Sequence, residues 1–271
     1  MTIAALDHIA LVVNDLDTAL DGLTRLLGRE ANWRGSGGGT RHAWYQLGNA
    51  ALDVIQPGEG NPMFAGAAGL WALAFATDDM EGDRRRLSRL SVASMDPMPV
   101  RTKADDGQTR TWPTAIVTGG ANGVTTFLVG ETPAWPPSPA AGDEAGAVIG
   151  LDHVVVSTRN PDRAAAFYGA RLGLPFKLDR SNPDWGTRLM FFQCGDLIVE
   201  VAQQLKDDPS NDPDSLWGLS WRVPDIDAAH ARIGQSFAVT DIRDGRKPGT
   251  RVFTVKDAPE GVPTLILGRT G

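Results

Sequence analysis

Two apolar runs open the two halves of the chain, and both begin with the same three letters. Residues 6–13 read LDHIALVV, and residues 151–156 read LDHVVV. Continuous runs of apolar and β-branched residues are typical of strands that are buried on both faces. The pattern therefore predicts a buried strand at the start of each half.

Each predicted strand is followed by the same succession of signals. Polar helix-start sequences occupy residues 14–19 and 160–165, and each helix is expected to end at a Leu-Gly pair, since glycine suits the C-terminal cap. A strand pair that turns at residues 48–49 or at residues 195–196 is expected next. The order of elements is therefore the same in both halves.

A weaker copy of this unit lies inside each half. Residues 70–80 (LWALAFATDDM) and 216–226 (LWGLSWRVPDI) each resemble the opening strand and run into a helix and further strands. The sequence thus predicts an α+β protein made of four βαβββ units. A Thr-Arg pair opens the third strand of all four copies: Thr40-Arg41, Thr109-Arg110, Thr187-Arg188 and Thr250-Arg251.

A stretch rich in proline and alanine, residues 131–142, separates the halves and reads as a semi-rigid linker. We expect an N-terminal domain over residues 1–130, a linker over 131–147 and a C-terminal domain over 148–271. A length of 271 residues fits two domains of ordinary size.

Composition narrows the possible partners. The formal net charge is −7 and basic residues do not cluster, so nucleic acid is not expected to bind. The single cysteine, Cys194, excludes an internal disulfide. Neither a signal peptide nor an apolar stretch that could span a bilayer is evident, so we expect a cytoplasmic protein that does not bind membranes.

A βαβββ unit that opens with Leu-Asp-His and occurs four times resembles the vicinal oxygen chelate superfamily. This fold is shared by glyoxalase I, extradiol dioxygenases, methylmalonyl-CoA epimerase, and bleomycin- or fosfomycin-resistance proteins. The resemblance implies that two units curl into one open barrel, and so two open barrels in tandem. One fold hosts many chemistries, so the activity is identified less well.

The resemblance also implies four metal-ligand positions in each barrel. His8 and Asp53 occupy two of them in the first half, and His153 and Glu200 do so in the second. The remaining positions carry no metal-binding side chain: Ala72 and Phe127 in the first half, Gly218 and Leu265 in the second. Two ligands hold a divalent ion weakly, so extradiol dioxygenase activity is disfavoured.

One histidine offers a replacement ligand in the first half. If residues 48–49 form a two-residue turn, Trp44 pairs opposite Asp53, and strand alternation places His42 on the same face. His8, His42 and Asp53 could then hold Zn, Ni, Fe, Mn or Co. Without a metal, the pairs His8/Asp53 and His153/Glu200 could act as His–carboxylate dyads in proton transfer, or they could be purely structural.

The substrate pocket is expected to be apolar with one polar corner. Trp71 and Trp217 should point to the opposite face and fill the core, because neighbours in a strand alternate. The arginines of the Thr-Arg pairs are expected in surface ion pairs, and residues 57–66 could cover the mouth of a barrel. The expected pocket residues are Trp44, Gln46, Ala72, Phe127, Phe191, Gly218 and Leu265.

Two functions remain open at this point. One is a glyoxalase-like lyase or isomerase that removes a proton beside the carbonyl of a small, partly apolar molecule. The other is a non-catalytic protein that binds or sequesters a small molecule, similar to the bleomycin-resistance proteins. The four units can build both barrels in one chain, so the protein could be a monomer or a homodimer.

Overall fold

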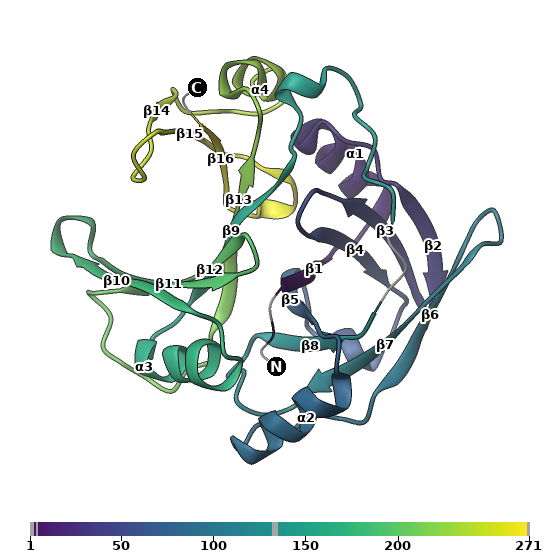
Figure 1. Cartoon of the computed structure of the whole chain (residues 1–271). Coiled ribbons are helices and arrows are strands. Elements are labelled where there is room, and N and C mark those ends of the chain that lie inside the picture. The colour runs from purple at the N-terminus through teal and green to yellow at the C-terminus, as the bar shows by residue number, and fades with distance from the viewer. Residues whose placement is uncertain (1–2, 4, 132–134, 270–271) are drawn as a thin grey trace.

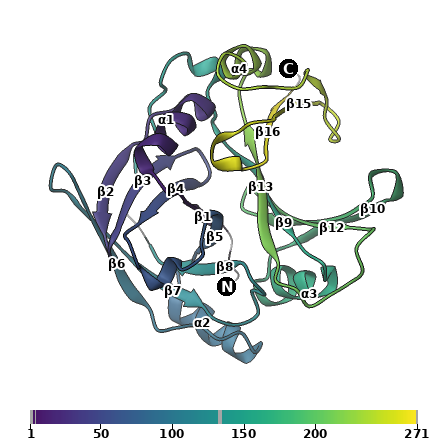
Figure 2. The ribbon, with the colours of Figure 1, turned by 180° about the vertical axis from the view of Figure 1, so that it is seen from behind.

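The computed structural model describes residues 3, 5–131 and 135–269, and each half of the chain forms one eight-stranded sheet (Figure 1 and, from behind, Figure 2). The first half contains β1 Ala5–Val12, α1 Leu16–Leu27, β2 Trp33–Gly37, β3 Thr40–Gln46, β4 Ala51–Pro57, η1 Pro62–Phe64, β5 Gly69–Ala76, α2 Met80–Arg89, β6 Met98–Ala104, β7 Thr109–Val117 and β8 Thr125–Val129. The second half contains η2 Glu144–Gly146, β9 Gly150–Ser157, α3 Pro161–Ala165, η3 Ala166–Arg171, β10 Phe176–Asn182, η4 Pro183–Trp185, β11 Thr187–Cys194, β12 Leu197–Gln204, β13 Ser215–Arg222, α4 Ile226–Ile233, β14 Arg243–Asp244, β15 Thr250–Val255, η5 Pro259–Gly261 and β16 Thr264–Arg269.

The first sheet closes into a barrel with the strand order β1-β4-β3-β2-β6-β7-β8-β5. Pairing of β2 with β6 closes it, at Gly35 opposite Ala104 and Ser36 opposite Lys103. A Cβ atom on Gly35 would lie 2.4 Å from the Lys103 carbonyl oxygen, a separation that real side chains do not adopt. The glycine-rich β2 therefore lets the two strands approach closely enough to complete the barrel.

The second sheet has the order β10-β11-β12-β9-β13-β16-β15-β14 and stays open. Its edge strand β14 has only two residues, Arg243 and Asp244, which leaves little backbone to pair with β10 at the other edge. The α+β fold of four repeated units is confirmed, but one barrel is closed where the resemblance implied two open ones.

The predicted helix signals act as expected. The Asp15 carboxylate accepts a hydrogen bond from the backbone N–H of Thr18 at the start of α1, and Gly28 ends this helix with φ of 65°. The Asn160 side chain caps α3 in the same way, by accepting from the N–H of Arg163. After α3 the helix widens into the π-helical η3.

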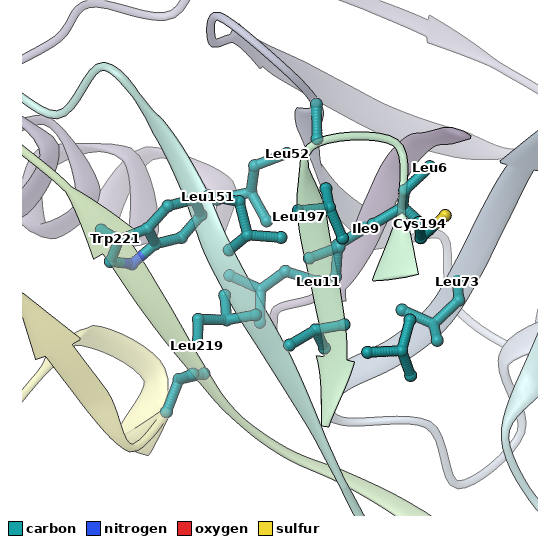
Figure 3. Packing of buried hydrophobic residues seen from close by; sticks show 14 of the residues in the cluster. Leu6, Ile9, Leu11, Leu52, Leu73, Leu151, Cys194, Leu197, Leu219 and Trp221 are labelled. Atoms are coloured by element: carbon teal, nitrogen blue, oxygen red, sulfur yellow. The ribbon is translucent and has the colours of Figure 1, made fainter. Parts of the chain in front are cut away.

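A single hydrophobic cluster joins the two halves. It contains Ile9 and Leu11 from β1 and continues into Leu151 and Leu219 of β9 and β13 (Figure 3). The outward side of the first barrel therefore packs against one face of the second sheet, and both sheets share their main core. None of the helices in the described ranges is long and apolar enough to cross a membrane.

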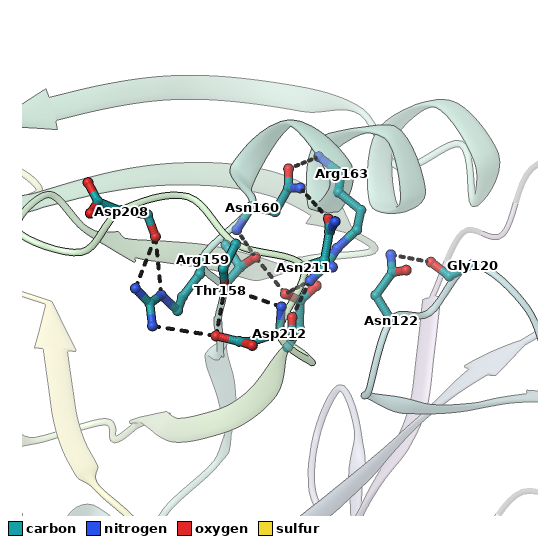
Figure 4. Close-up of polar contacts among 11 residues, drawn as sticks. Gly120, Asn122, Thr158, Arg159, Asn160, Arg163, Asp208, Asn211 and Asp212 are labelled. Atoms are coloured by element: carbon teal, nitrogen blue, oxygen red, sulfur yellow. Dashed lines mark hydrogen bonds and ion pairs between the residues drawn. The ribbon is translucent and has the colours of Figure 1, made fainter.

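Polar contacts add to this junction. The backbone N–H of Asp214, in the loop before β13, donates to the carbonyl of Asn122 in the first half at 2.7 Å. Arg159 and Arg163 hold the same loop through carbonyl and carboxylate oxygens around Asp212 (Figure 4). The loop thus fixes the second sheet to a turn of the first.

Residues 135–148, the described part of the connection between the halves, pack onto the first barrel. The buried guanidinium of Arg29 donates to the Val148 carbonyl at 2.8 Å and to the Glu144 carboxylate at 2.6 Å. The hydroxyl oxygen of Ser138 accepts from the backbone N–H of Gln46. The segment therefore acts as a structural strap as well as a connection, and the domain limits at residues 130 and 148 stay predictions.

Candidate functional site

The interior of the first barrel combines tryptophans with most of the buried polar side chains of that half. Trp44 lies opposite Asp53 in the β3–β4 pair, as the two-residue turn predicted. His42 and Trp44 therefore share the inward face with Asp53. The apolar interior cluster comprises Ala10, Val12, Trp33, Trp44, Ala51, Ile55, Phe64, Ala72, Ala74, Trp112, Phe127 and Val129.

A bulge in β1 gives His8 an unexpected partner. Leu6 pairs with Phe75 and His8 with Ala74, so Asp7 is an extra residue without a partner in the ladder. A bulge of this kind redirects a side chain that strand alternation would place on the other face. The Asp7 carboxylate consequently reaches the His8 ring, with Oδ1 2.6 Å from Nδ1.

Asp53 is paired with His42 instead of His8. Its Oδ1 lies 2.9 Å from the His42 Nδ1, and the His42 Nε2 lies 2.5 Å from the Thr40 hydroxyl oxygen. The Thr40 hydroxyl oxygen also lies 2.5 Å from the Gly37 carbonyl oxygen. Both ring nitrogens of His42 are therefore engaged within the barrel.

The three side chains expected to bind a metal are thus divided between two separate pairs. His8 is bonded to Asp7, while His42 and Asp53 are bonded to each other. Within the part of the chain that the structure describes, no group of three or more His, Cys, Asp or Glu side chains is arranged to hold a metal ion. Ala72 and Phe127, at the other two positions, are buried in the interior cluster and supply no donor. The donors present do not fit a resident metal.

The second half repeats the bulge. Asp152 is the extra residue between the pairs formed by Leu151 and His153, and its carboxylate lies 3.0 Å from the His153 Nδ1. The His153 Nε2 lies 3.8 Å from the Glu200 Oε2, which is too long for a hydrogen bond. Both histidines of the Leu-Asp-His motif therefore take the preceding aspartate as their partner, and neither forms the expected dyad by a direct hydrogen bond.

The pKa values of the two carboxyl groups near His153 are shifted in opposite directions. Burial alone would raise the pKa of Asp152, but hydrogen bonds from His153 and Arg222 outweigh it and lower the pKa to about 2. Burial raises the pKa of Glu200, and the charge of His153 only partly offsets this effect. Asp152 is thus firmly ionised, while Glu200 is held less readily as a carboxylate.

The expected pocket residues are separated by the structure. Trp44, Ala72 and Phe127 lie together inside the first barrel. Gln46 is turned toward its own turn, where its side-chain amide donates to the Leu47 carbonyl at 3.3 Å. In the second sheet Phe191 lies opposite Glu200. Gly218 and Leu265 lie on the strands β13 and β16 of the same sheet, which forms no closed interior.

The expectation for Trp71 and Trp217 is wrong, and bulges again explain the error. Trp71 is an extra residue in β5, so it turns inward and packs against Phe64 and Phe127 at ring-centroid distances of 4.6 and 5.5 Å. Trp217 is the extra residue at the matching point of β13, and it is 57% exposed because the open sheet has no interior there. Phe64, from the segment expected to cover the barrel mouth, is buried against Trp71.

Sequence reasoning missed the central cation of the barrel, Arg110. Its guanidinium carbon lies 3.9 Å from the centre of the Trp44 ring and 4.2 Å from that of Trp135, in the segment between the halves. Burial lowers the pKa of Arg110 to about 10, so it stays protonated at neutral pH, and Asp53 and Asp7 oppose the decrease. The side chain is 4% exposed.

A shift in register explains why Arg110 points inward while Arg41, in the matching motif, does not. Arg41 lies three positions before Trp44, whose partner is Asp53. Arg110 lies six positions before Ile116, which occupies the corresponding place opposite Phe127. These separations of three and six residues differ by an odd number. Because side chains alternate between the two faces of a strand, the two arginines lie on opposite faces. Counting the residues between each Thr-Arg pair and the end of its strand could have revealed that Arg110 faces inward.

The other three arginines of the motif behave as expected. Arg41, Arg188 and Arg251 form ion pairs with Asp17, Asp179 and Asp227, at 3.1, 2.7 and 2.6 Å. These carboxylates lie at the surface, so the pairs contribute little to stability. Arg110 alone of the four lies inside a barrel.

Comparisons with known proteins agree with this architecture. Residues 6–145 match the family model described as Glyoxalase-like domain, and residues 152–254 match the Glyoxalase/Bleomycin resistance protein/Dioxygenase superfamily. No curated protein sequence matches the chain.

Solved structures show the same fold at low sequence identity. A triple mutant of 4-hydroxymandelate synthase from Streptomyces coelicolor is 17% identical with a TM-score of 0.71, covering 100% of this chain and 94% of that one. The Mn(II)-bound glyoxalase from Novosphingobium aromaticivorans is 13% identical with a TM-score of 0.67, covering 100% and 83%. A 2,2',3-trihydroxybiphenyl 1,2-dioxygenase from Sphingomonas wittichii is 16% identical with a TM-score of 0.63, covering 98% and 91%. At this identity the likeness establishes the fold and not the reaction.

Proposed function

Because the chain belongs to the vicinal oxygen chelate superfamily and carries two glyoxalase-like domains, we propose that it is a small-molecule enzyme whose reaction takes place in the first barrel. The reaction is of the lyase or isomerase type and begins with removal of a proton beside a carbonyl group. The substrate is small and partly apolar, in keeping with an interior walled by tryptophans.

The observation that carries this proposal is the Asp7–His8 pair. Asp7 accepts the proton on the His8 Nδ1, which fixes the tautomer and leaves the lone pair on Nε2. The His8 ring lies on the barrel side against Trp44, at a centroid distance of 4.7 Å, and is buried. A neutral imidazole that is oriented by a carboxylate and shielded from bulk water is suited to act as a general base.

The steps balance without another reactant. The His8 Nε2 takes the proton from the carbon beside the carbonyl, and the electron pair moves toward the carbonyl oxygen. The proton then returns to a neighbouring atom in an isomerisation, or a leaving group departs from the adjacent carbon in an elimination. The charge on the imidazolium is stabilised by Asp7 throughout.

His42 and Asp53 have a supporting role in this proposal. Both His42 ring nitrogens are already hydrogen-bonded to side chains of the barrel, so this imidazole is less free than that of His8 to contact a substrate. It fixes β3 to β4 within the barrel, beside the wall formed by Trp44. No step is assigned to a metal, because His8, His42 and Asp53 are divided between two pairs.

Hydrogen exchange on carbonyl compounds tests the proposal. The purified protein in D₂O is mixed with a panel of small ketones and aldehydes, and deuterium uptake beside the carbonyl is followed by NMR. We expect uptake with the wild type and a loss of at least about 100-fold in rate in His8→Gln, the usual effect of removing a general base. His153→Gln is the matched control, and we expect it to exchange at the wild-type rate.

Two results would contradict the proposal. Unchanged exchange in His8→Gln, with the protein folded, would remove His8 from the reaction. Stoichiometric transition metal in the purified wild type, together with loss of exchange after chelation, would transfer the carbonyl activation to the metal.

A second candidate is a protein that binds a small molecule without converting it. The open second sheet favours it, because Trp217 and Leu178 are about half exposed there and offer apolar surface to a ligand. Tight binding of a compound with no exchange or turnover would support this alternative. A cytoplasmic location and a monomeric or homodimeric state stay predictions.

A further inference from the structure

Arg110 is a buried cation with no ion-pair partner within residues 5–131 and 135–269. Its Nε is buried without a hydrogen-bond partner among the residues that the structure describes. The two carboxylates that influence its charge are engaged elsewhere, Asp53 with His42 and Asp7 with His8. A buried charge is costly unless it is paired, so such an arrangement calls for an explanation.

A second buried arginine of the same half shows how the protein satisfies such a group when its role is structural. Arg29, 8% exposed, donates to the carbonyl oxygens of Val148 and Ser138 and to both carboxylate oxygens of Glu144. Arg110 is more deeply buried, at 4%, and is surrounded by the faces of tryptophan rings. Cation–π contacts hold a guanidinium in place but leave its N–H groups in the ring plane unsatisfied.

Other donors without partners lie in the same barrel. Within the described part of the chain, the indole N–H groups of Trp33, Trp44 and Trp135 are buried without an acceptor, as is the hydroxyl of Thr102, which pairs across the strands with Arg110. Buried donors normally find acceptors. A set of donors around one cation fits a ligand that brings several acceptor oxygens.

We propose that Arg110 forms the anion-binding end of the first barrel and recognises the carboxylate of a small molecule with an apolar or aromatic body. The planar guanidinium matches a carboxylate in a two-point hydrogen bond. Among the described residues, Arg110 is the one buried arginine or lysine inside the first barrel, and Asp53 and Asp7 lie near it, so a monoanion fits better than a dianionic phosphate. The tryptophans then contact the apolar body.

The inference rests on the proposed function in one respect, which is that reaction and recognition share the first barrel. Trp44 contacts both His8 and Arg110, so it forms the wall between the proposed base and the anion site. A ligand anchored at Arg110 would lie along Trp44 toward His8. The substrate class is therefore a carbonyl compound that also carries a carboxylate.

Paired acids and amides test the site. Acetate, propionate and phenylacetate are titrated against acetamide, propionamide and phenylacetamide, and binding to the full chain is followed by tryptophan fluorescence. In the wild type we expect at least one acid to bind about 10-fold more tightly than its amide, as charge-assisted hydrogen bonds predict. Phenylphosphonate is included as a dianion and should bind more weakly than phenylacetate.

Two variants separate recognition from packing. Arg110→Met keeps the length of the side chain, and we expect it to lose the preference for the acid while its melting temperature stays equal or rises, because an unpaired buried charge is removed. Arg29→Met is the matched control, which should melt at a lower temperature and keep the preference. Arg110→Lys keeps the charge and should retain part of the preference.

Several outcomes would overturn the inference. They are equal binding of every acid and its amide in the wild type, a preference that survives in Arg110→Met, or tighter binding of phenylphosphonate than of phenylacetate. If hydrogen exchange fails while the acid preference holds, the proposed reaction is wrong and the anion site stands. If exchange occurs without any acid preference, the reaction stands and the anion site is wrong.

Discussion

The two halves of this chain consist of the same βαβββ units, but the first forms a closed barrel and the second an open sheet. In the first, β2 and β6 meet and enclose a cation, two histidines and several tryptophans. In the second, the matching edges are β10 and β14, which do not pair, and the corresponding face stays open. The two halves thus share the order of their strands and helices, whereas the pairing of the edge strands decides which half has an enclosed interior.

The difference depends on glycine residues at the seam, the line along which β2 pairs with β6. Gly35 and Gly37 in β2 lie so close to the backbone of β6 that a Cβ atom on either would meet a carbonyl oxygen of Lys103 or Arg101. The matching strand β10 reads FKLDRSN and contains no glycine. A sheet closes into a barrel only when its two edge strands approach each other along their length. Glycines permit this approach in the first half, whereas larger side chains on an edge strand such as β10 hinder it.

The largest effect is expected when the seam itself is changed. In Gly37→Ala the new Cβ would lie 2.2 Å from the Arg101 carbonyl oxygen, so β2 and β6 must separate. We expect the free energy of unfolding to fall by about 3 kcal/mol, as in other overpacked sites. Urea unfolding measures this, and faster hydrogen exchange of β6 amides would locate it.

Gly142→Ala is the control for this change, because a Cβ at Gly142 meets no atom within 4 Å. We expect its unfolding free energy to lie within about 0.5 kcal/mol of the wild type. Equal stability of Gly37→Ala and Gly142→Ala would show that close approach at the seam does not hold the barrel together.

A smaller effect is expected from the tryptophans at the repeated bulge. Trp71 is half-buried against Phe64 and Phe127, so Trp71→Ala should lower the unfolding free energy by about 2 kcal/mol. Trp217, its counterpart, is 57% exposed, and Trp217→Ala should change the unfolding free energy by less than about 0.5 kcal/mol. Chemical unfolding of both variants compares the halves directly, and similar losses would show that the second sheet also buries its bulge residue.

The smallest effect concerns pH and the second half. Hydrogen bonds from His153 and Arg222 lower the pKa of Asp152 from 3.8 to about 2, against the effect of burial. The folded-state pKa is depressed, so this contribution is present above about pH 4 and is lost as the pH falls toward 2. After allowance for partial exposure of the carboxylate to solvent, it amounts to about 1 kcal/mol.

Asp152→Asn should therefore lower the unfolding free energy at pH 7 by about 1 kcal/mol and make little difference at pH 2. Denaturant unfolding at both pH values measures the change. A difference between wild type and variant that is the same at pH 7 and pH 2 would show that the ionised carboxylate is not the source of the stability.

The sequence by itself determined the repeated unit, the α+β class and the order of elements. It did so because apolar runs, N-cap residues such as Asp15 and Asn160, and two-residue turns are local signals. The same local geometry correctly placed Trp44 opposite Asp53, since a tight turn fixes the register of its hairpin.

The tertiary structure alone decided the partners inside the barrel. Asp7 meets His8 because a bulge breaks strand alternation, and Arg110 faces inward because its strand is offset by an odd number of residues. Trp135 comes from a segment that read as a linker. Bulges, offsets and closure depend on which strands become neighbours, and that choice involves residues far apart in the sequence.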